Sequence, residues 1–156
     1  TERWVERLKE IDMKLQIEPV QQVRPRARRV KNGISMYDPK KVKDYKALIG
    51  KTAGSEYTGE PLKGDLIVDL TFAVAIQKSI TKAERLKRVS NEHRPHMRPD
   101  VDNYIKSTLD GLNGVLWDDD AQIVDLNAHK VYDVIPHVDI HVVEIANYWL
   151  RFNQGT

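Results

Sequence analysis

The sequence predicts a single α+β domain, built as a mixed, mainly antiparallel sheet packed with helices. Three stretches, residues 66–74, 123–132 and 138–145, alternate apolar with polar residues, which is the pattern of strands with one buried face. We expect the last two to be antiparallel strands joined across Pro136. Two others, residues 38–49 and 102–112, repeat apolar residues at helical spacing. The 156 residues, 40% of them hydrophobic, suffice for one core, and no change of composition divides them.

The N-terminal residues predict an amphipathic helix followed by a strand. Trp4, Leu8 and Ile11 recur at helical spacing among charged residues, which favours a helix of about three turns. Residues 13–20 alternate and predict the first strand, which Pro19 ends.

The chain is expected to divide into three segments. These are an N-terminal helix over residues 1–12, the main domain over residues 13–147 and a C-terminal tail over residues 148–156. The tail is apolar enough to cover a neighbouring surface, and with the N-terminal helix it is our candidate for part of a subunit contact.

Arginines cluster after the first strand. Four of them, Arg24, Arg26, Arg28 and Arg29, stand within six residues. Pro25 and the repulsion between like charges disfavour a helix, so we expect a loop or a ribbon that turns at residues 31–33 into a short strand. A guanidinium group can bind two phosphate oxygens, and its charge displaces counterions from DNA. The cluster therefore predicts contact with DNA phosphates.

The next helix is expected to begin at Asp38 and Pro39. Asp38 is a suitable N-cap and Pro39 a suitable first helical residue, and the apolar spacing continues to about Ile49. Residues 50–64 are rich in Gly, Ser, Thr and charged residues, which predicts a loop before the strand at residues 66–74.

A short basic helix is expected in the middle of the chain. Thr81 and Glu84 form the pattern of a capping box for a helix that reaches about Val89. This region is rich in lysine and arginine, and it continues through Arg94 and Arg98 into an acidic stretch. We expect Arg94 and Arg98 to join the arginine cluster in binding DNA.

Two aspartates and a lysine follow at informative spacings. Asp100 and Asp102 stand two apart, so their side chains point the same way if this entry is extended. Asp102 or Asn103 then caps a helix that ends near Gly114. Lys106 lies one helical turn after Asp102, which places the amine and the carboxylate on one face.

Three adjacent aspartates, Asp118, Asp119 and Asp120, precede the strand at residues 123–132. Carboxylates in contact raise each other's pKa and oppose folding unless a cation or a basic group neutralises them. A solvated acidic turn would also account for such a run. It would not require a second Asp-x-Asp pair or a lysine at helical spacing, so the pattern favours a metal site. Ligand sets made only of oxygen select hard cations such as Mg²⁺ or Mn²⁺.

These residues form an ordered series of motifs. The series is Arg98-Pro99-Asp100-Val101-Asp102-Asn103, Lys106, Leu109-Asp110-Gly111-Leu112-Asn113-Gly114, Trp117 and Asp119-Asp120-Ala121-Gln122-Ile123-Val124. It resembles the signature of the RusA family of Holliday junction resolvases. A weaker likeness at residues 21–26 and 36–39 extends the resemblance over about residues 14–145. The resemblance implies a RusA-like fold.

The resemblance also implies an activity. It is that of a Mg²⁺-dependent crossover junction endodeoxyribonuclease, which acts as a homodimer on four-way DNA junctions in recombination and repair. The enzyme would resolve a junction by paired symmetric nicks, and two symmetric cuts require two active sites related by a two-fold axis. Because the family is common in phages, the resemblance favours a phage origin.

Spacing and the matched family positions together assign roles to single residues. Asp100, Asp102 and Asp120 are expected to bind the metal, with Asp119 as the alternative third ligand. Lys106 is expected to act on the scissile phosphate, so that it completes the catalytic set with the three aspartates. The alternative for Lys106 is an ion pair with Asp102, or with the aspartate one turn further on, that only neutralises the site.

The net charge of +2 conceals two electrically opposite halves. Residues 1–98 carry 22 Lys or Arg against 13 Asp or Glu, whereas residues 99–156 carry 3 against 10. A basic part that holds phosphates beside an acidic part that holds cations suits a metal-dependent nuclease. The alternative is that charges from the two halves pair across the fold and cancel.

Several function classes are disfavoured. The chain has no cysteine, which excludes a disulfide framework and thiol-ligated zinc, and no Gly-x-Ser-x-Gly motif of a serine hydrolase. No apolar run is long enough for a membrane span, and we expect the protein in the cytoplasm of a bacterial or phage-infected cell. Two rival hypotheses remain: a non-cleaving DNA-junction binding module, and a metal-dependent phosphohydrolase that acts on nucleotides.

Overall fold

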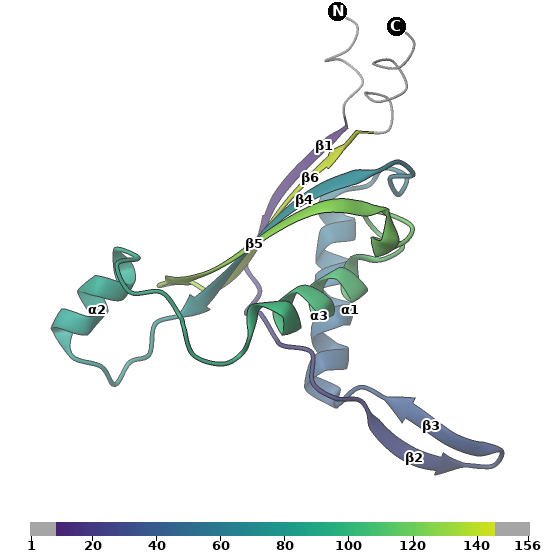
Figure 1. Ribbon diagram of the computed structural model, residues 1–156, viewed down its shortest axis with the longest axis horizontal. Coiled ribbons are helices and arrows are strands. Elements are labelled where there is room, and N and C mark those ends of the chain that lie inside the picture. Colours follow the sequence, from purple (N-terminus) through teal and green to yellow (C-terminus); the bar gives the residue numbers. More distant parts are fainter. Residues whose placement is uncertain (1–8, 146–156) are drawn as a thin grey trace, which may run out of the picture.

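The computed structural model describes residues 9–145, and its centre is a four-stranded sheet (Figure 1). The strands, in the order β1-β6-β4-β5, are β1 (Glu10–Leu15), β6 (His137–Glu144), β4 (Leu66–Ala75) and β5 (Ile123–Asp133). Strand β6 is antiparallel to both β1 and β4, whereas β4 and β5 are parallel. The prediction of an α+β domain with a mixed, mainly antiparallel sheet is confirmed.

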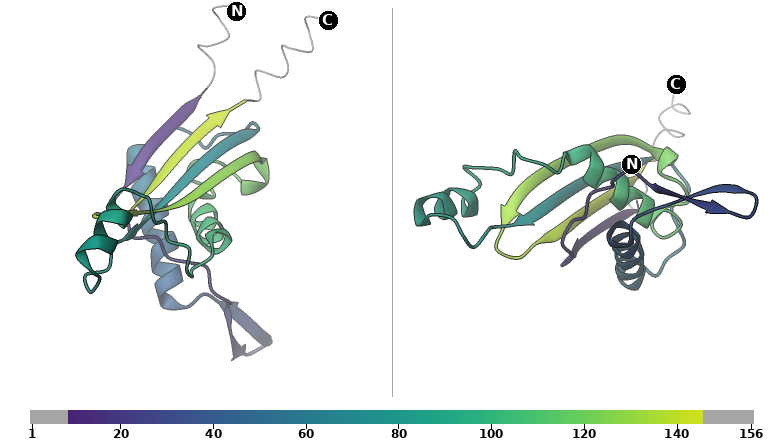
Figure 2. Two further views of the ribbon diagram at one scale, coloured as in Figure 1. Left: turned by 60° about the vertical axis from the view of Figure 1, so that its left-hand side comes forward. Right: turned by 90° about the horizontal axis from the view of Figure 1, so that it is seen from below.

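Two helices, α1 (Lys40–Glu56) and α3 (Val101–Leu112), lie together on one side of this sheet (Figures 1 and 2). Alternate residues of β1, β4 and β6 are buried, so these strands contribute one face to the core. Leu112 and Trp117 are fully buried in the same core. Because α3 is packed in this way, its outer face can present charged residues to solvent.

Glycines allow α1 and α3 to approach each other closely. A Cβ atom added to Gly50 would lie 2.6 Å from the carbonyl oxygen of Gly111. The hydroxyls of Tyr45 and Thr108 share a buried hydrogen bond of 2.7 Å between the same helices. The prediction of a loop from residue 50 is therefore wrong as far as Glu56, because packing against α3 outweighs the cost of about 1 kcal/mol for a glycine inside a helix.

The N-terminal prediction requires a correction. Residues 10–12, expected at the end of a helix, belong to β1, where Ile11 and Met13 are buried and pair with β6. The spacing from Leu8 to Ile11 fits one helical turn, whereas the spacing from Ile11 to Met13 fits the alternation of a strand. Pairing with β6 selects the strand. Strand β1 also ends at Leu15, before the predicted end. Residues 1–8 and the expected tail at 148–156 lie outside the described residues.

The order of the strands also differs from expectation. Residues 123–132 and 138–145 were expected to be two antiparallel strands joined across Pro136. Strands β5 and β6 do run in opposite directions, but β4 lies between them and pairs with both. Consecutive buried residues at Phe72 and Ala73 agree with this central position of β4.

Two elements extend from the body of the protein (Figures 1 and 2). Strands β2 (Arg26–Val30) and β3 (Gly33–Tyr37) form a separate two-stranded hairpin, which we call the ribbon. The expected ribbon and turn are thus confirmed. Helix α2 (Lys82–Val89) extends at the opposite end of the molecule, and Thr81 caps it by accepting a hydrogen bond from the Glu84 backbone N–H. Among the described residues, no helix is long and apolar enough to cross a bilayer.

Candidate active site

The N-terminus of α3 presents two of the expected metal ligands. Asp100 occupies the N-cap position with an extended backbone, and Asp102 lies in the first helical turn. The prediction that Asp102 or Asn103 caps this helix is therefore wrong by two or three residues. Both carboxylates are exposed, and neither forms an ion pair within residues 9–145. The helix dipole favours negative charge at this end, so α3 itself stabilises the pair.

Lys106 lies one turn further along α3 and is exposed. Its amine forms no ion pair with any residue that the structure describes. Asp110, the candidate partner one turn beyond, pairs with Lys46 of α1 at 3.1 Å instead. The charge of Lys106 is thus available to a ligand.

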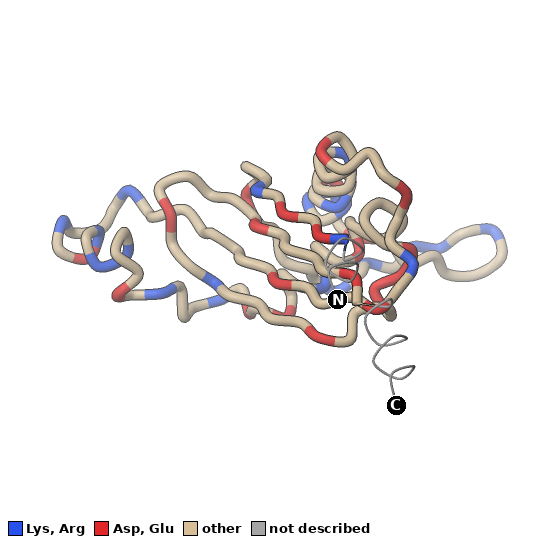
Figure 3. The backbone as a smooth tube through the Cα atoms, turned by 90° about the horizontal axis from the view of Figure 1, so that it is seen from above, with Lys and Arg blue, Asp and Glu red and all other residues tan. Residues whose placement is uncertain are grey.

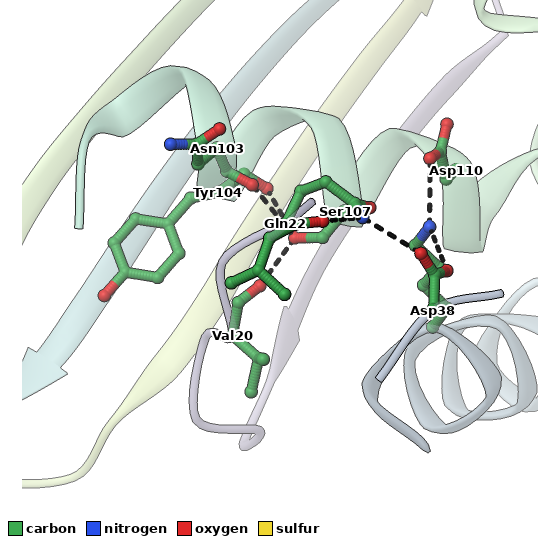
Figure 4. Close-up of polar contacts among 9 residues, drawn as sticks. Val20, Gln22, Asp38, Asn103, Tyr104, Ser107 and Asp110 are labelled. Atoms are coloured by element: carbon green, nitrogen blue, oxygen red, sulfur yellow. Dashed lines mark hydrogen bonds and ion pairs between the residues drawn. The ribbon is translucent and has the colours of Figure 1, made fainter. Parts of the chain in front are cut away.

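A polar network joins the base of the ribbon to both helices (Figure 4). The Lys46 amine lies 2.8 Å from Asp38 Oδ2 and 3.1 Å from Asp110 Oδ2, and Gln22 Nε2 donates to Asp38 Oδ1 at 3.0 Å. The hydrogen bond from Lys46 lowers the pKa of Asp38 against the effect of burial, and Gln22 and the positive charge of Lys106 act in the same direction. Asp38 therefore remains ionised, close to Lys106.

This network corrects the predicted start of α1. Asp38 was expected to cap the helix, but the N-cap position is taken by Pro39 and no side chain caps it. The carboxylate of Asp38 is engaged by Lys46, which lies on the second turn of the same helix. The two oxygens of Asp38 accept from the Lys46 amine and the Gln22 amide, so neither is used for the backbone N–H groups of the first turn.

The segment at residues 20–25 is fastened along α3. The Ser107 hydroxyl donates to the carbonyl of Val20 at 2.6 Å, and the backbone N–H of Gln22 donates to the carbonyl of Asn103 at 2.8 Å (Figure 4). Next to this segment lies a groove of about 520 Å³, which we call the cationic groove. Its lining residues are Gln21, Gln22, Val23, Arg24, Pro25, Arg98, Asn103 and Lys106.

The cationic groove brings together three residues that the sequence singled out separately. Arg24 and Arg98 were expected to bind DNA, and Lys106 was expected to act on a phosphate. Three cations that line one groove favour a polyanion as the ligand. The groove also begins beside α3, whose first turn carries the exposed Asp100 and Asp102.

The other arginines lie further out. Arg26, Arg28 and Arg29 are exposed on β2, and the Arg28 guanidinium lies 5.3 Å from the ring centroid of Tyr37. Arg94 is exposed in the connection between α2 and α3. Figure 3 shows lysine and arginine concentrated at the ribbon and at the α2 end, with most acidic residues between them. The opposite charges of the chain are therefore partly separate in space, although Lys46 with Asp110 and Lys63 with Asp118 do pair across the two halves.

The three adjacent aspartates have three different environments. Asp118 pairs with Lys63 at 2.8 Å, with both side chains exposed. Asp119 caps the 3-10 helix η2 (Asp120–Gln122) by accepting from the backbone N–H of Ala121 at 3.1 Å, and that bond lowers its pKa. Asp120 forms no ion pair within the described part of the chain. Its pKa is raised, first by burial and then by the neighbouring Asp119 and the charge of Asp110.

Gln122 holds this acidic turn in place, a role that sequence reasoning did not assign. Its side-chain oxygen accepts from the backbone N–H groups of Asp118 and Asp119, each at 3.0 Å. Its amide nitrogen donates to the carbonyls of Leu62 and Gly64, each at 2.9 Å. Lys46 and Gln22 were missed in the same way, because their partners are distant in sequence and no spacing pattern indicates them.

The expected ligands do not converge in one chain. Asp100 and Asp102 lie at the start of α3. Asp110 lies near the end of α3, and its negative charge helps to raise the pKa of Asp120, so Asp120 is near that end of the helix. Asp102 and Asp110 are about 12 Å apart along the helix axis. Within residues 9–145, no three acidic or histidine side chains gather closely enough to hold a metal ion. The described part of one chain therefore offers pairs of carboxylates but no group of three.

A basic ribbon, a cationic groove and exposed carboxylates at the start of α3 suit a nuclease, which has to hold a polyanion and cut it. Lys106 in that groove has no ion pair within the described residues. The family described as "Endodeoxyribonuclease RusA" matches residues 16–143, and the chain belongs to this family. It is also 33% identical over 132 residues to the "Uncharacterized protein YqaN" of Bacillus subtilis (strain 168), covering 83% of this chain and 92% of that protein.

Proposed function

We propose that this endodeoxyribonuclease is selective for DNA structure and resolves four-way (Holliday) junctions by paired symmetric nicks, in DNA recombination and repair. The observation that carries the proposal is Lys106, which has no ion pair within residues 9–145 and lines a groove with Arg24 and Arg98. Asp100 and Asp102 lie at the start of the helix that carries Lys106. Membership of the family supports cleavage within a DNA chain. We place the enzyme in the cytoplasm of a bacterial or phage-infected cell.

The chain's own residues supply binding and charge stabilisation. Arg24 and Arg98 hold the phosphates on either side of the cut, because each guanidinium can bind two phosphate oxygens. Lys106 acts on the scissile phosphate, where its positive charge stabilises the negative charge that develops in the transition state. The ribbon arginines Arg26 and Arg28, with Arg94 at the other end, extend contact to more distant phosphates.

We propose that cleavage uses a divalent cation, Mg²⁺ or Mn²⁺. Asp100, Asp102 and Asp120 are the proposed ligands, because each is without an ion pair among the described residues. Asp119 is the weaker candidate, since its carboxylate is engaged as a cap. A bound cation would supply an activated water and positive charge at the phosphate.

The separation of these carboxylates supports a homodimer. Because one chain places Asp102 and Asp120 towards opposite ends of α3, a complete site takes the start of α3 from one copy and the acidic turn from a second. A two-fold axis would then create two equal sites, as paired nicks in a symmetric junction require.

The test compares three substrates: a synthetic four-way junction, a linear duplex of the same sequence and a nucleoside triphosphate, each with Mg²⁺, Mn²⁺ or EDTA. We expect paired nicks in the junction alone, only with metal, and a dimer by light scattering. Junction binding without nicking under any metal would falsify the enzymatic proposal and favour a binding module. Hydrolysis of the nucleotide alone would instead indicate a phosphohydrolase.

A further inference from the structure

The two faces of the ribbon differ in chemistry. In the register of β2 and β3, Arg26 stands opposite Tyr37 and Arg28 opposite Ser35, so these residues share one face. On the other face Ala27 stands opposite Met36, and Arg29 opposite Ile34. One face is therefore basic and aromatic. The other, which we call the apolar face, carries Ile34 and Met36 side by side along β3.

The apolar face is open to solvent. Ile34 is 71% exposed and Met36 is 61% exposed, so little within residues 9–145 packs over them. Two large apolar side chains that extend from the body on a narrow hairpin lose hydrophobic stabilisation by staying in water. Contiguous exposed apolar surface of this kind indicates a binding partner.

The charges around the apolar face select the kind of partner. Arg26 and Arg28 lie on the opposite face of the ribbon, and Arg29 stands beside Ile34 on the apolar face itself. Just before β2 in the sequence, Arg24 lines the cationic groove. A partner that satisfies both faces must present phosphates and apolar surface together. DNA does so where base pairs are unstacked, because the flat faces of the bases are then accessible.

We propose that the apolar face docks against the bases at the branch point of a four-way junction, with Ile34 and Met36 as a wedge. This inference rests on the proposed function and adds to it the means by which a junction is distinguished from a duplex. The arginines meet phosphates in both kinds of DNA. In a linear duplex a wedge has to break stacking between two base pairs that are stacked on both sides. A base pair at a branch point is stacked less firmly, so unstacking it costs less.

The experiment uses the full chain in EDTA, with 2-aminopurine placed at the branch point of a synthetic junction. We expect the wild type to raise the fluorescence, because the base becomes unstacked. Ile34→Ser/Met36→Ser should leave the fluorescence near that of free junction and reduce the preference for junction over duplex about tenfold. Val30→Ser is the matched control, because Val30 is 45% exposed on the same ribbon and faces the arginine side. It should behave as the wild type does.

A second probe does not depend on loss of function. The chain contains no cysteine, so Ile34→Cys creates a unique site for a polarity-sensitive dye. Its emission should shift to the blue with junction and not with duplex, and a dye at Val30→Cys should show no such shift.

Each outcome separates the two proposals. If the wild type neither prefers nor nicks the junction, the proposed function fails. If the wild type does both and Ile34→Ser/Met36→Ser keeps its fluorescence rise and its preference, the wedge is wrong while the function stands. A change from dimer to monomer in this variant, measured by light scattering, would assign the apolar face to a second copy and overturn the wedge as well.

Discussion

Two lysines on neighbouring helices meet the acidic residues around them in opposite ways. Lys46 on α1 is only 20% exposed in its side chain and pairs with both Asp38 and Asp110. Lys106 on α3 is exposed and has no ion pair among the described residues. Burial acts to lower the pKa of Lys46, but its hydrogen bonds to the two carboxylates outweigh that effect and raise it. Lys46 is a structural cation, whereas Lys106 remains available to a substrate.

The aspartates of this region divide in the same way. Asp110 pairs with Lys46 and Asp118 pairs with Lys63, so their charges are compensated inside the chain. Asp100, Asp102 and Asp120 have no such partner within residues 9–145. The lack of an ion pair among the described residues, and not the acidic composition alone, therefore distinguishes the aspartates that are candidates for chemistry from those that hold the fold.

The largest effect is expected for Asp102→Asn. If its carboxylate binds the cation, junction nicking in Mg²⁺ should fall at least about 10³-fold, while junction binding in EDTA stays within a few-fold of the wild type. Asp118→Asn removes a carboxylate that pairs with Lys63, so it serves as the matched control and should nick normally. Equal losses in both variants would contradict the division of the aspartates.

Lys106→Ala comes next. Removing its charge from the scissile phosphate should slow nicking about 10²- to 10³-fold. The thermal midpoint should change little, because Lys106 forms no ion pair within residues 9–145 and acts only weakly on Asp38. Single-turnover nicking and thermal unfolding of the same preparation measure both. A lower midpoint with unchanged nicking would identify Lys106 as structural after all.

Lys46→Ala should lower stability and affect nicking little, which is the reverse of Lys106→Ala. It leaves Asp38 and Asp110 without their shared cation, which costs about 1 kcal/mol for partly exposed pairs and lowers the thermal midpoint by about 2–4 °C. Lys40→Ala is the control, because the pair of Lys40 with Asp44 is largely exposed and contributes little. If Lys40→Ala destabilises as much, the network around Lys46 has no special weight.

The same network predicts a dependence on pH. Because the pKa of Asp38 is lowered from its ordinary value of 3.8, its contribution to stability is present above that value and is lost as the pH falls through the lower, folded-state pKa. The difference in unfolding free energy between the wild type and Asp38→Asn should therefore disappear in acid. Urea titrations from neutral pH down to about pH 2 would measure it. A difference that persists unchanged into acid would mean that the ionised carboxylate is not the source.

The smallest effect is expected for Asp120→Asn, which should stabilise the fold instead of destabilising it. Because the pKa of Asp120 is raised, its ionised form opposes folding above its folded-state pKa, and this cost vanishes at low pH. Asp120→Asn should raise the thermal midpoint slightly at neutral pH without metal and have no effect in acid. A lower midpoint at neutral pH would show that Asp120 has a stabilising partner instead.

Local sequence patterns predicted where helices and strands occur better than they predicted which elements lie side by side. Alternation placed the strands at residues 66–74 and 123–132 correctly, because it reflects which face is buried. It could not show that β4 lies between β5 and β6, since several strand orders bury the same faces. The sequence predicted a loop from Gly50 because glycine is uncommon inside helices. The reason for a glycine inside α1 is the close contact with Gly111, which the sequence alone does not show.

The candidate site shows the same limit. The spacing of Asp100, Asp102 and Lys106 correctly placed them at the start of one helix, since all three depend on local geometry. The part of Asp120 in the same metal site stays a prediction, because spacing along the sequence does not show how the turn after α3 lies relative to the start of that helix. The partners of Asp38 and Asp110 lie on α1, and no periodicity in the sequence connects them.

The crossing of Gly50 with Gly111 has a consequence for how such an enzyme can be altered. Backbone rests against backbone there, so no side chain can yield and α1 and α3 behave as one stiff frame. The ribbon joins this frame through the short connection at Asp38. If the ribbon selects the DNA and Lys106 acts on the phosphate, as proposed above, a longer, shorter or exchanged ribbon would change the DNA that is recognised while Lys106 keeps its place on α3. Target choice could then be engineered separately from chemistry.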